Sequence, residues 1–199
     1  MFVLYALLVA IPLGLLLGGR LERLGETPVR WAPLAIAGLA IQLVLFAAPV
    51  AAVVGDAGPP VYVASTALVL AVVLANLSLP GVPLIAVGAA SNLLAIIANG
   101  GYMPADPGAL AAAGETMGEG YSNSVVVADP ALRPLTDIFA TPAWLPLSNV
   151  FSIGDVLIAV GLAWAVVAAM RRPVTAGTDP SGARGTGTNG SSRPGQGRG

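Results

Sequence analysis

The chain has 199 residues, of which 56% are apolar and 10% are charged, and its mean hydropathy is +0.83. Soluble domains usually have about a quarter charged residues, so this composition predicts a multi-pass integral membrane protein. The sequence contains no cysteine and no histidine, which excludes disulfides, thiol nucleophiles, imidazole catalysis and zinc sites made from these residues. We therefore expect no cofactor and no bound metal. No basic face with interleaved aromatic residues indicates nucleic-acid binding.

Five apolar blocks come close to the roughly 20 residues that a helix needs to cross a bilayer. The predicted spans are residues 2–18, 31–54, 60–79, 82–98 and 150–170. The fold class predicted for residues 1–172 is an all-α integral membrane domain with about five transmembrane helices. Residues 99–149 should form a long extracytoplasmic loop. Residues 173–199 have few apolar side chains, which predicts a disordered cytoplasmic tail.

The distribution of cations predicts the orientation of the chain. Two groups of arginines flank the blocks: Arg20, Arg23 and Arg30 after the first, and Arg171 and Arg172 after the fifth. Short loops rich in Lys and Arg stay in the cytoplasm, and five spans place both groups on the same side. The loop of residues 99–149 has five acids against Arg133 alone. We therefore expect the amino terminus outside and the carboxyl terminus inside, in the cytoplasmic membrane.

Two amides mark one end of the fourth block. Asn92 and Asn99 are seven residues apart, so two helical turns bring them to one face, and Gly100-Gly101 then allows a sharp turn. One interpretation is a polar site at the outer face. In the other, Asn99 caps the helix and Asn92 bonds a neighbouring helix, as amides in membranes often do.

Asp155 lies one turn inside the fifth block, after Ser152 and Gly154. A carboxylate in a spanning helix is costly and usually faces the bundle interior or a water-filled cavity, so it indicates a functional site. At the first turn it could instead complement the positive end of the helix dipole. The candidate site residues are thus Asn92, Asn99, Gly100, Gly101, Ser152 and Asp155.

Four stretches carry a family resemblance. They are GGRLERLGE followed by Trp31, SNLLAIIANGGYMP, LTDIFATP and FSIGDVLIAVG. Together they resemble a bacterial membrane family catalogued as domain of unknown function 5317, over roughly residues 1–170. The resemblance implies a multi-pass inner-membrane protein and supplies no reaction.

A second, partial resemblance concerns signal peptidase II, an aspartyl enzyme with a Phe-Asn-x-Ala-Asp motif entering its last helix. Residues 151–155, FSIGD, are similar to that motif, and Asn99-Gly100-Gly101 is similar to its Asn-x-Gly motif. The family's Gly-Asn-x-x-Asp-Arg motif, which supplies its other catalytic aspartate, has no counterpart in this chain. The resemblance implies an intramembrane hydrolase in which Asp137 and Asp155 share a proton.

Three hypotheses about function follow. The first is a structural, assembly or binding component without catalysis, whose partners are the lipid bilayer and a membrane protein or a second copy of the chain. The second is the aspartyl hydrolase, which needs the carboxylates of Asp137 and Asp155 within hydrogen-bond reach. The third is a subunit of an oligomeric transporter or channel, with a polar path lined by Gln42, Asn76, Asn92 and Asp155.

Overall fold

The computed structural model describes residues 2–115 and 124–172. The tail predicted for residues 173–199 lies outside the described residues, as does part of the predicted loop.

Five apolar helices make up about half of the described chain, as the hydropathy pattern predicts. They are α1 (Phe2–Leu16), α2 (Ala32–Leu45), α4 (Gly58–Leu74), α5 (Val82–Ala98) and α7 (Ile153–Met170). Two helical segments, Gly55–Leu74 and Ile153–Met170, are long and apolar enough to cross a membrane, by length and composition only. The other three are apolar and shorter.

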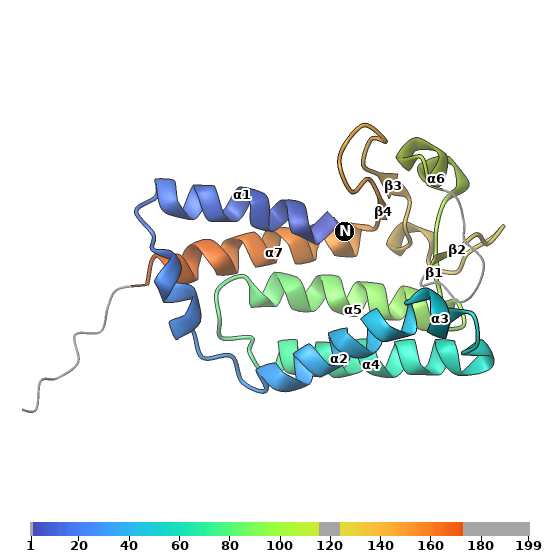
Figure 1. The fold of residues 1–199 in the computed structure, drawn as a ribbon, viewed down its shortest axis with the longest axis horizontal. Helices are drawn as coiled ribbons and strands as arrows, with labels where there is room; N and C mark the ends of the chain where they lie inside the picture. The colour runs from blue at the N-terminus through green and yellow to red at the C-terminus, as the bar shows by residue number, and fades with distance from the viewer. Residues whose placement is uncertain (1, 116–123, 173–199) are drawn as a thin grey trace, which may run out of the picture.

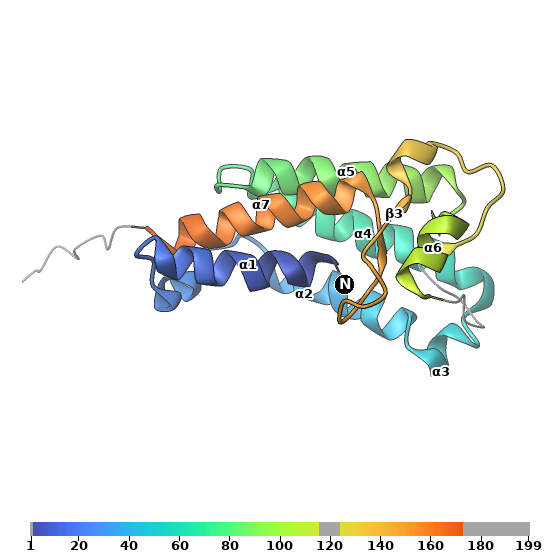
Figure 2. The ribbon, with the colours of Figure 1, turned by 90° about the horizontal axis from the view of Figure 1, so that it is seen from above.

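The five helices pack in an order that differs from their order along the chain. α7 packs between α1 and α5, α5 also contacts α4, and α4 contacts α2. Figures 1 and 2 show α7 (orange) beside α1 (blue), with α5 (green) on its other side. α2 and α4 are also joined by a hydrogen bond of 3.2 Å from Gln42 Nε2 to Thr66 Oγ1. The last helix of the chain therefore links the first helix to the rest.

Glycines bring α5 and α7 close together. Gly88 and Gly154 face each other across this contact, and so do Gly81 and Gly161. The two glycines on each side are seven positions apart in the sequence. A Cβ on Gly88 would lie 3.0 Å from the backbone nitrogen of Ile158, and one on Gly161 would lie 2.6 Å from the carbonyl oxygen of Gly81. Small residues commonly allow such close approach between membrane helices.

The block at residues 31–54 is not one helix. α2 ends at Leu45, Ala47 is extended (φ −67°, ψ 133°), and a separate short helix α3 spans Ala48–Ala51. Pro49 explains the break, because in a continuous helix its ring would clash with the carbonyl group of Leu45, four residues earlier. The block predicted as a single span therefore contains two helices instead of one continuous helix.

The ends of three other blocks also differ from the prediction. α1 ends at Leu16 rather than residue 18, and α4 spans Gly58–Leu74 rather than 60–79. α7 begins at Ile153, because Val150–Phe151 forms strand β4 and pairs with strand β3 (Phe139–Ala140). Apolar strand residues directly before a helix are indistinguishable by hydropathy from the helix itself. α5 occupies residues 82–98, the bounds of its block.

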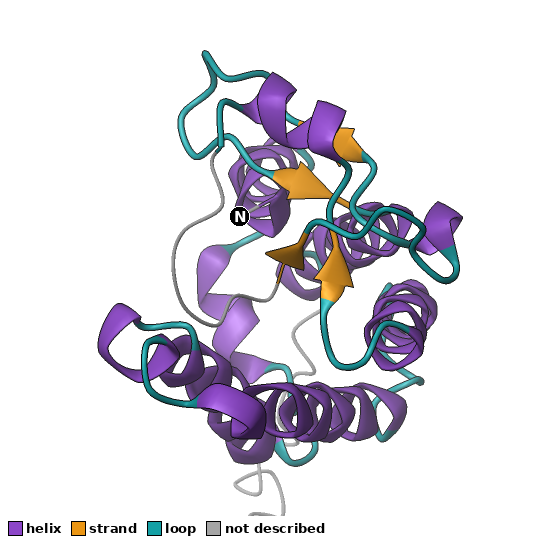
Figure 3. Cartoon of the chain, turned by 90° about the vertical axis from the view of Figure 1, so that its right-hand side faces the viewer, coloured by secondary structure: helices purple, strands orange, loops and turns teal. Residues whose placement is uncertain are grey.

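The described residues between α5 and α7 form a compact layer over one end of the helices, which we call the loop layer (residues 99–115 and 124–152). It contains helix α6 (Pro107–Ala113), the 3₁₀ turn η3 (Arg133–Leu135) and two small sheets. Strand β1 (Met103–Pro104) pairs in parallel with β2 (Ser124–Val125), and β3 pairs antiparallel with β4. Figure 3 looks onto this layer, with the strands in orange. The Tyr5 hydroxyl donates a hydrogen bond to the Pro146 carbonyl and so ties α1 to the layer.

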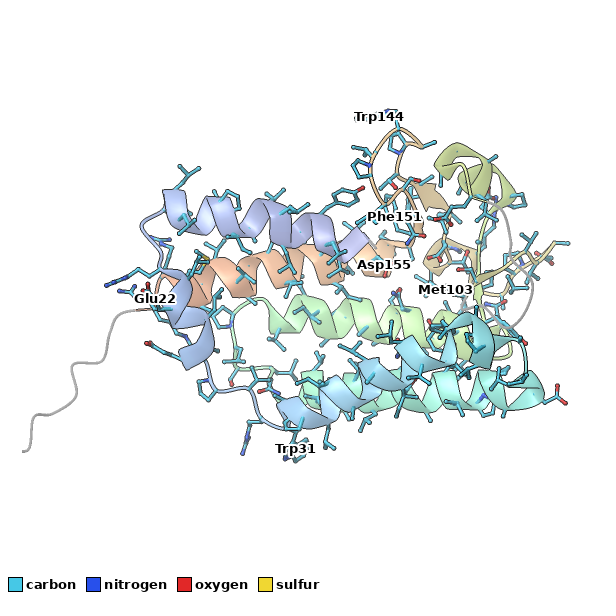
Figure 4. All side chains as sticks on the ribbon, viewed as in Figure 1. Glu22, Trp31, Met103, Trp144, Phe151 and Asp155 are labelled. Carbon is cyan, nitrogen blue, oxygen red and sulfur yellow. The ribbon has the colours of Figure 1, made fainter. Side chains whose placement is uncertain are left out.

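The opposite end holds both groups of arginines, and we call it the arginine end (residues 17–31, 75–81 and 170–172). The 3₁₀ helix η1 (Leu21–Glu26) packs against the end of α7, and the Arg20 backbone nitrogen donates to the Met170 carbonyl oxygen over 2.9 Å. Figure 4 shows Glu22 at this end and Asp155 at the other. The arginines before α2 and after α7 therefore lie on one side of the molecule, as the predicted topology requires.

Candidate functional site

The contact between α5 and α7 brings three polar side chains together where α7 begins. Asn92 on α5 donates from Nδ2 to Asp155 Oδ1 over 2.9 Å. The Ser152 hydroxyl oxygen is 2.9 Å from Asn92 Oδ1 and 3.0 Å from Asp155 Oδ2, and its single proton can be donated to only one of them at a time. Ser152 is completely buried. We call Asn92, Ser152 and Asp155 the polar cluster.

Two members of the polar cluster also form the start of α7. The Ser152 side chain accepts from the Asp155 backbone nitrogen over 3.1 Å, and the Asp155 side chain accepts from the Ser152 backbone nitrogen over 3.0 Å. This reciprocal pair is a capping box, which satisfies two backbone donors that the helix leaves unpaired. Asp155 therefore stabilises its helix end and bonds a neighbouring helix through different oxygens.

Asn99 and the Gly100-Gly101 turn have other contacts. Asn99 Nδ2 donates to the carbonyl oxygens of Ala95 and Ala131, and its Oδ1 accepts from the Ala131 backbone nitrogen, over 2.8–2.9 Å. Gly101 has φ +90°, and a Cβ there would lie 2.9 Å from Pro59 Cα. Asn99 thus holds the loop layer against α5, and the turn packs on the start of α4. The structure does not bring Asn99 into hydrogen-bond contact with Asp155.

Asp137 is a buried acid of the loop layer, with 6% of its surface exposed. Its backbone is fixed by a hydrogen bond of 2.9 Å to the Pro104 carbonyl oxygen, while its side-chain Oδ1 is buried and has no hydrogen-bond partner among the described residues. Burial, together with the negative charge of Asp155, raises the pKa of Asp137 to about 7. Within the described residues, no hydrogen bond joins the two carboxylates, and both oxygens of Asp155 are bonded to Asn92 and Ser152.

A second polar site of the loop layer was missed by the sequence analysis. Asp106 Oδ1 accepts from the backbone nitrogens of Gly108 and Ala109 over 2.8 and 3.2 Å, and Asp106 Oδ2 is 3.3 Å from the Arg133 guanidinium. The hydrogen bond from Ala109 and the bond to Arg133 lower the pKa of Asp106. A cavity of about 300 Å³ is lined by Asp106, Arg133 and Thr136 among others. The sequence could have indicated Asp106 as a helix start, because Asp followed by Pro is a helix-start signal. Its pairing with Arg133 could not be predicted, because it depends on how the loop layer folds.

Gln42 and Asn76 lie at other helix contacts. Gln42 bonds Thr66 between α2 and α4, and Asn76 bonds the backbone nitrogen and oxygen of Arg30 over 2.8 and 2.9 Å. Of the four residues in the hypothetical polar path, the structure therefore brings together only Asn92 and Asp155. In the described part of the chain, no three acidic side chains gather where they could hold a metal ion.

The fold and the polar cluster define a class of protein built from five apolar helices with a compact loop layer over one end. Asp155 is the only charged side chain within these five helices. The chain belongs to the family described as Family of unknown function (DUF5317), whose model matches residues 26–167. This confirms the resemblance drawn from the sequence, although GGRLERLGE lies almost wholly before the matched residues. No curated protein and no solved structure matches the chain.

The hydrogen bond between Asn92 and Asp155 should be measurable as a coupling free energy. We expect a double-mutant cycle of Asn92→Ala and Asp155→Ala, read from unfolding in detergent, to give a coupling of about 1–2 kcal/mol, because hydrogen bonds to charged groups are stronger than neutral ones. Ser91→Ala is the matched control, since the neighbouring Ser91 hydroxyl is buried and no residue that the structure describes bonds it. Ser91→Ala and Asp155→Ala should be additive within about 0.5 kcal/mol. Equal couplings in the two cycles would contradict the assigned contact.

Proposed function

We propose that the chain is a multi-pass membrane protein whose five apolar helices cross the cytoplasmic membrane and whose loop layer is an extracytoplasmic binding face. The observation that carries the proposal is that the helices contain one charged side chain and expose large apolar residues along their length. Leu8, Leu43 and Val160 are 68%, 78% and 52% exposed. Soluble monomers rarely expose so much contiguous apolar surface, whereas lipid would cover it.

The length of the helices is compatible with this location. α7 has 18 residues, or about 27 Å at 1.5 Å per residue, against a hydrocarbon core of about 30 Å. α2 has 14 residues and reaches about 21 Å alone. The following segment, residues 46–54, contains α3 and no charged side chain, and it extends this apolar path. A bilayer accommodates the remaining mismatch by local thinning.

The loop layer supports binding more directly than catalysis. It exposes large apolar side chains away from the helices, including Trp144 at 80%, Leu147 at 53% and Phe139 at 43%. Aromatic residues on a rigid support are typical of protein interfaces. The hydrogen bonds of the polar cluster and of Asn99 hold α5, α7 and the loop layer together. These contacts favour a rigid support for the exposed apolar residues of the loop layer. The partner that fits is another membrane protein or a second copy of the chain.

Single cysteines test the location and orientation. The chain has no cysteine, so an introduced one is a unique label. We place one at Trp144 in the loop layer and one at Glu22 at the arginine end, both exposed. A membrane-impermeant maleimide should label Trp144→Cys in intact cells and Glu22→Cys only after permeabilisation. The reverse pattern would overturn the orientation, and recovery of the protein in the soluble fraction would overturn the membrane location.

The binding face is tested by crosslinking from the same positions. A photoreactive phenylalanine at Trp144 should give a specific crosslinked product in native membranes, and one at Glu22 should not give the same product. If crosslinking at Trp144 yields only lipid adducts, the face rests on the membrane surface and the binding proposal fails.

The aspartyl hydrolase is the second candidate, favoured by one observation. Burial and the nearby charge of Asp155 raise the pKa of Asp137 to about 7, so this acid can hold a proton near neutral pH, as the acid of an acid–base pair must. Within the described residues, however, the Asp155 carboxylate bonds Asn92 and Ser152 and not Asp137. The test is cleavage of a fluorophore–quencher lipopeptide mixture by the purified protein. Both Asp137→Asn and Asp155→Asn should abolish cleavage, whereas Asp129→Asn, at an exposed acid of the same layer, should not. Absence of cleavage by the wild type would exclude this candidate for those substrates.

A further inference from the structure

A cavity of about 310 Å³ lies at the arginine end, between α4, α5, α7 and the segment that joins α1 to α2. Its walls are mainly apolar side chains from these elements: Leu24, Val72, Val73, Ile85, Leu162 and Val166. The polar residue deep in the wall, Asn76, is already satisfied, because it bonds the Arg30 backbone and the Val72 carbonyl oxygen. The interior of the cavity therefore offers apolar contacts to whatever fills it.

The cavity extends along the last part of α7. The lining residues on this helix reach from Leu162 to Ala169, and Arg172, just after its end, also lines the cavity. Leu162 lies eight residues before Met170, the last residue of α7, which is about 12 Å of helix. Half of a hydrocarbon core is about 15 Å. In the proposed membrane location, the cavity would thus extend from the headgroup boundary most of the way to the bilayer centre.

Two arginines and a hydroxyl group lie on the cavity wall at the arginine end or directly beside it. Arg172 lines the cavity, whereas Arg23 lies beside it, next to the lining residue Leu24, and donates from Nη1 to the Met170 carbonyl oxygen over 3.5 Å. Arg23 Nε and the hydroxyl oxygen of Thr27, another lining residue, are buried with no hydrogen-bond partner in the described chain. Among the described residues, neither Arg23 nor Arg172 has a carboxylate within ion-pair distance. Two uncompensated guanidinium groups and a free hydroxyl suit a phosphate.

We propose that this cavity binds an anionic phospholipid, with one acyl chain in its apolar part and the phosphate at Arg23 and Arg172. The inference rests on the membrane location proposed above. The apolar part of the cavity would accept the acyl chain of any lipid. The two arginines therefore determine the preference for an anionic headgroup. Anionic lipids are attracted to basic residues at the cytoplasmic membrane surface, which is the side predicted for the arginine end.

The test is native mass spectrometry of the full chain in detergent, titrated with phosphatidylglycerol or phosphatidylcholine of the same acyl chains. Wild-type protein should bind phosphatidylglycerol more tightly. Arg172→Gln and Arg23→Gln should each weaken that binding about fivefold, as expected for one surface guanidinium near an anionic lipid. They should weaken phosphatidylcholine binding less, because the positive charge of choline offsets the phosphate. Val73→Trp, which fills the cavity, should weaken the binding of both lipids. Inorganic phosphate at millimolar concentration should not displace the lipid, because it lacks the acyl chain.

Arg171→Gln is the matched control, because Arg171 is exposed and does not line the cavity. The substitution changes the net charge by the same amount as Arg172→Gln. It should leave the affinity for phosphatidylglycerol unchanged. Equal binding of the two lipids by the wild type, an equal loss in Arg171→Gln and Arg172→Gln, or displacement by free phosphate would overturn the proposal. Should Val73→Trp not fold, the arginine variants decide the question alone. The maleimide labelling tests the membrane location independently, so a failure of the lipid site and a failure of the location are distinguishable.

Discussion

Replacing Asp137 by Asn should stabilise the protein at pH 8 and leave its stability nearly unchanged at pH 4. The pKa of Asp137 is raised from 3.8 to about 7 in the folded chain. Between these values the unfolded chain has lost the proton and the folded chain still holds it, so stability falls as the pH rises from about 4 to 7 and is level above that range. A difference of about three pKa units corresponds to about 4 kcal/mol at most. Asn has the same shape and does not ionise, so the variant should lack this loss.

The measurement is unfolding in detergent at several pH values, expressed as the difference between variant and wild type, because other groups titrate in both. Asp129→Asn serves as the control, since Asp129 is exposed in the same loop layer and its replacement should give a difference near zero at every pH. A difference for Asp137→Asn that does not grow between pH 4 and 7 would show that the carboxyl group is hydrated in the folded protein.

Gly88→Leu should destabilise the protein by about 1–3 kcal/mol, the usual effect of inserting a large side chain into a well-packed contact. The new Cβ would meet the Gly154 carbonyl oxygen and would lie 3.0 Å from the Ile158 nitrogen. Both are backbone atoms, so α5 and α7 would have to separate. That separation would also lengthen the contact between Asn92 and Asp155, which lie one turn further along the same pair of helices.

Gly25→Leu is the control for this substitution, because a Cβ at Gly25 has nothing within 4 Å. Its melting temperature in detergent should stay close to that of the wild type, while that of Gly88→Leu falls. Gly88→Ala should give a smaller decrease in the same direction. Equal melting temperatures for Gly88→Leu and the wild type would mean that the two helices are not held at the distance described.

Most of the helical content could be predicted because it depends on local properties. Apolar runs bounded by prolines and arginines predicted five helices, and the bounds of α5 agree with its block. The break after Leu45 also has a local cause in Pro49, but a count of apolar residues does not register it. The short strands β3 and β4 were missed, since each is two residues long and is defined by its pairing with the other.

The candidate site also combines features that the local sequence predicts with features that depend on the fold. The sequence predicts Ser152 and Asp155 at a helix start, because their spacing of three residues is a local capping signal. Asp155 and Asn92 are 63 residues apart in the sequence, so their contact depends on which two helices pack together. The burial of Asp137 depends in turn on the fold of the loop layer. One sequence without a known fold contains no signal for either of these.

The position of α7 between α1 and α5 also has a consequence for synthesis. α1 leaves the ribosome before α7, with roughly 140 residues between them. At about 5–20 residues per second, α1 is complete for about 7–28 s before translation reaches α7. Among the described helices, α7 is the one that α1 contacts extensively, so during that interval α1 lacks its main neighbour. In the proposed membrane location, the bilayer or a chaperone would accommodate α1 until α7 is made.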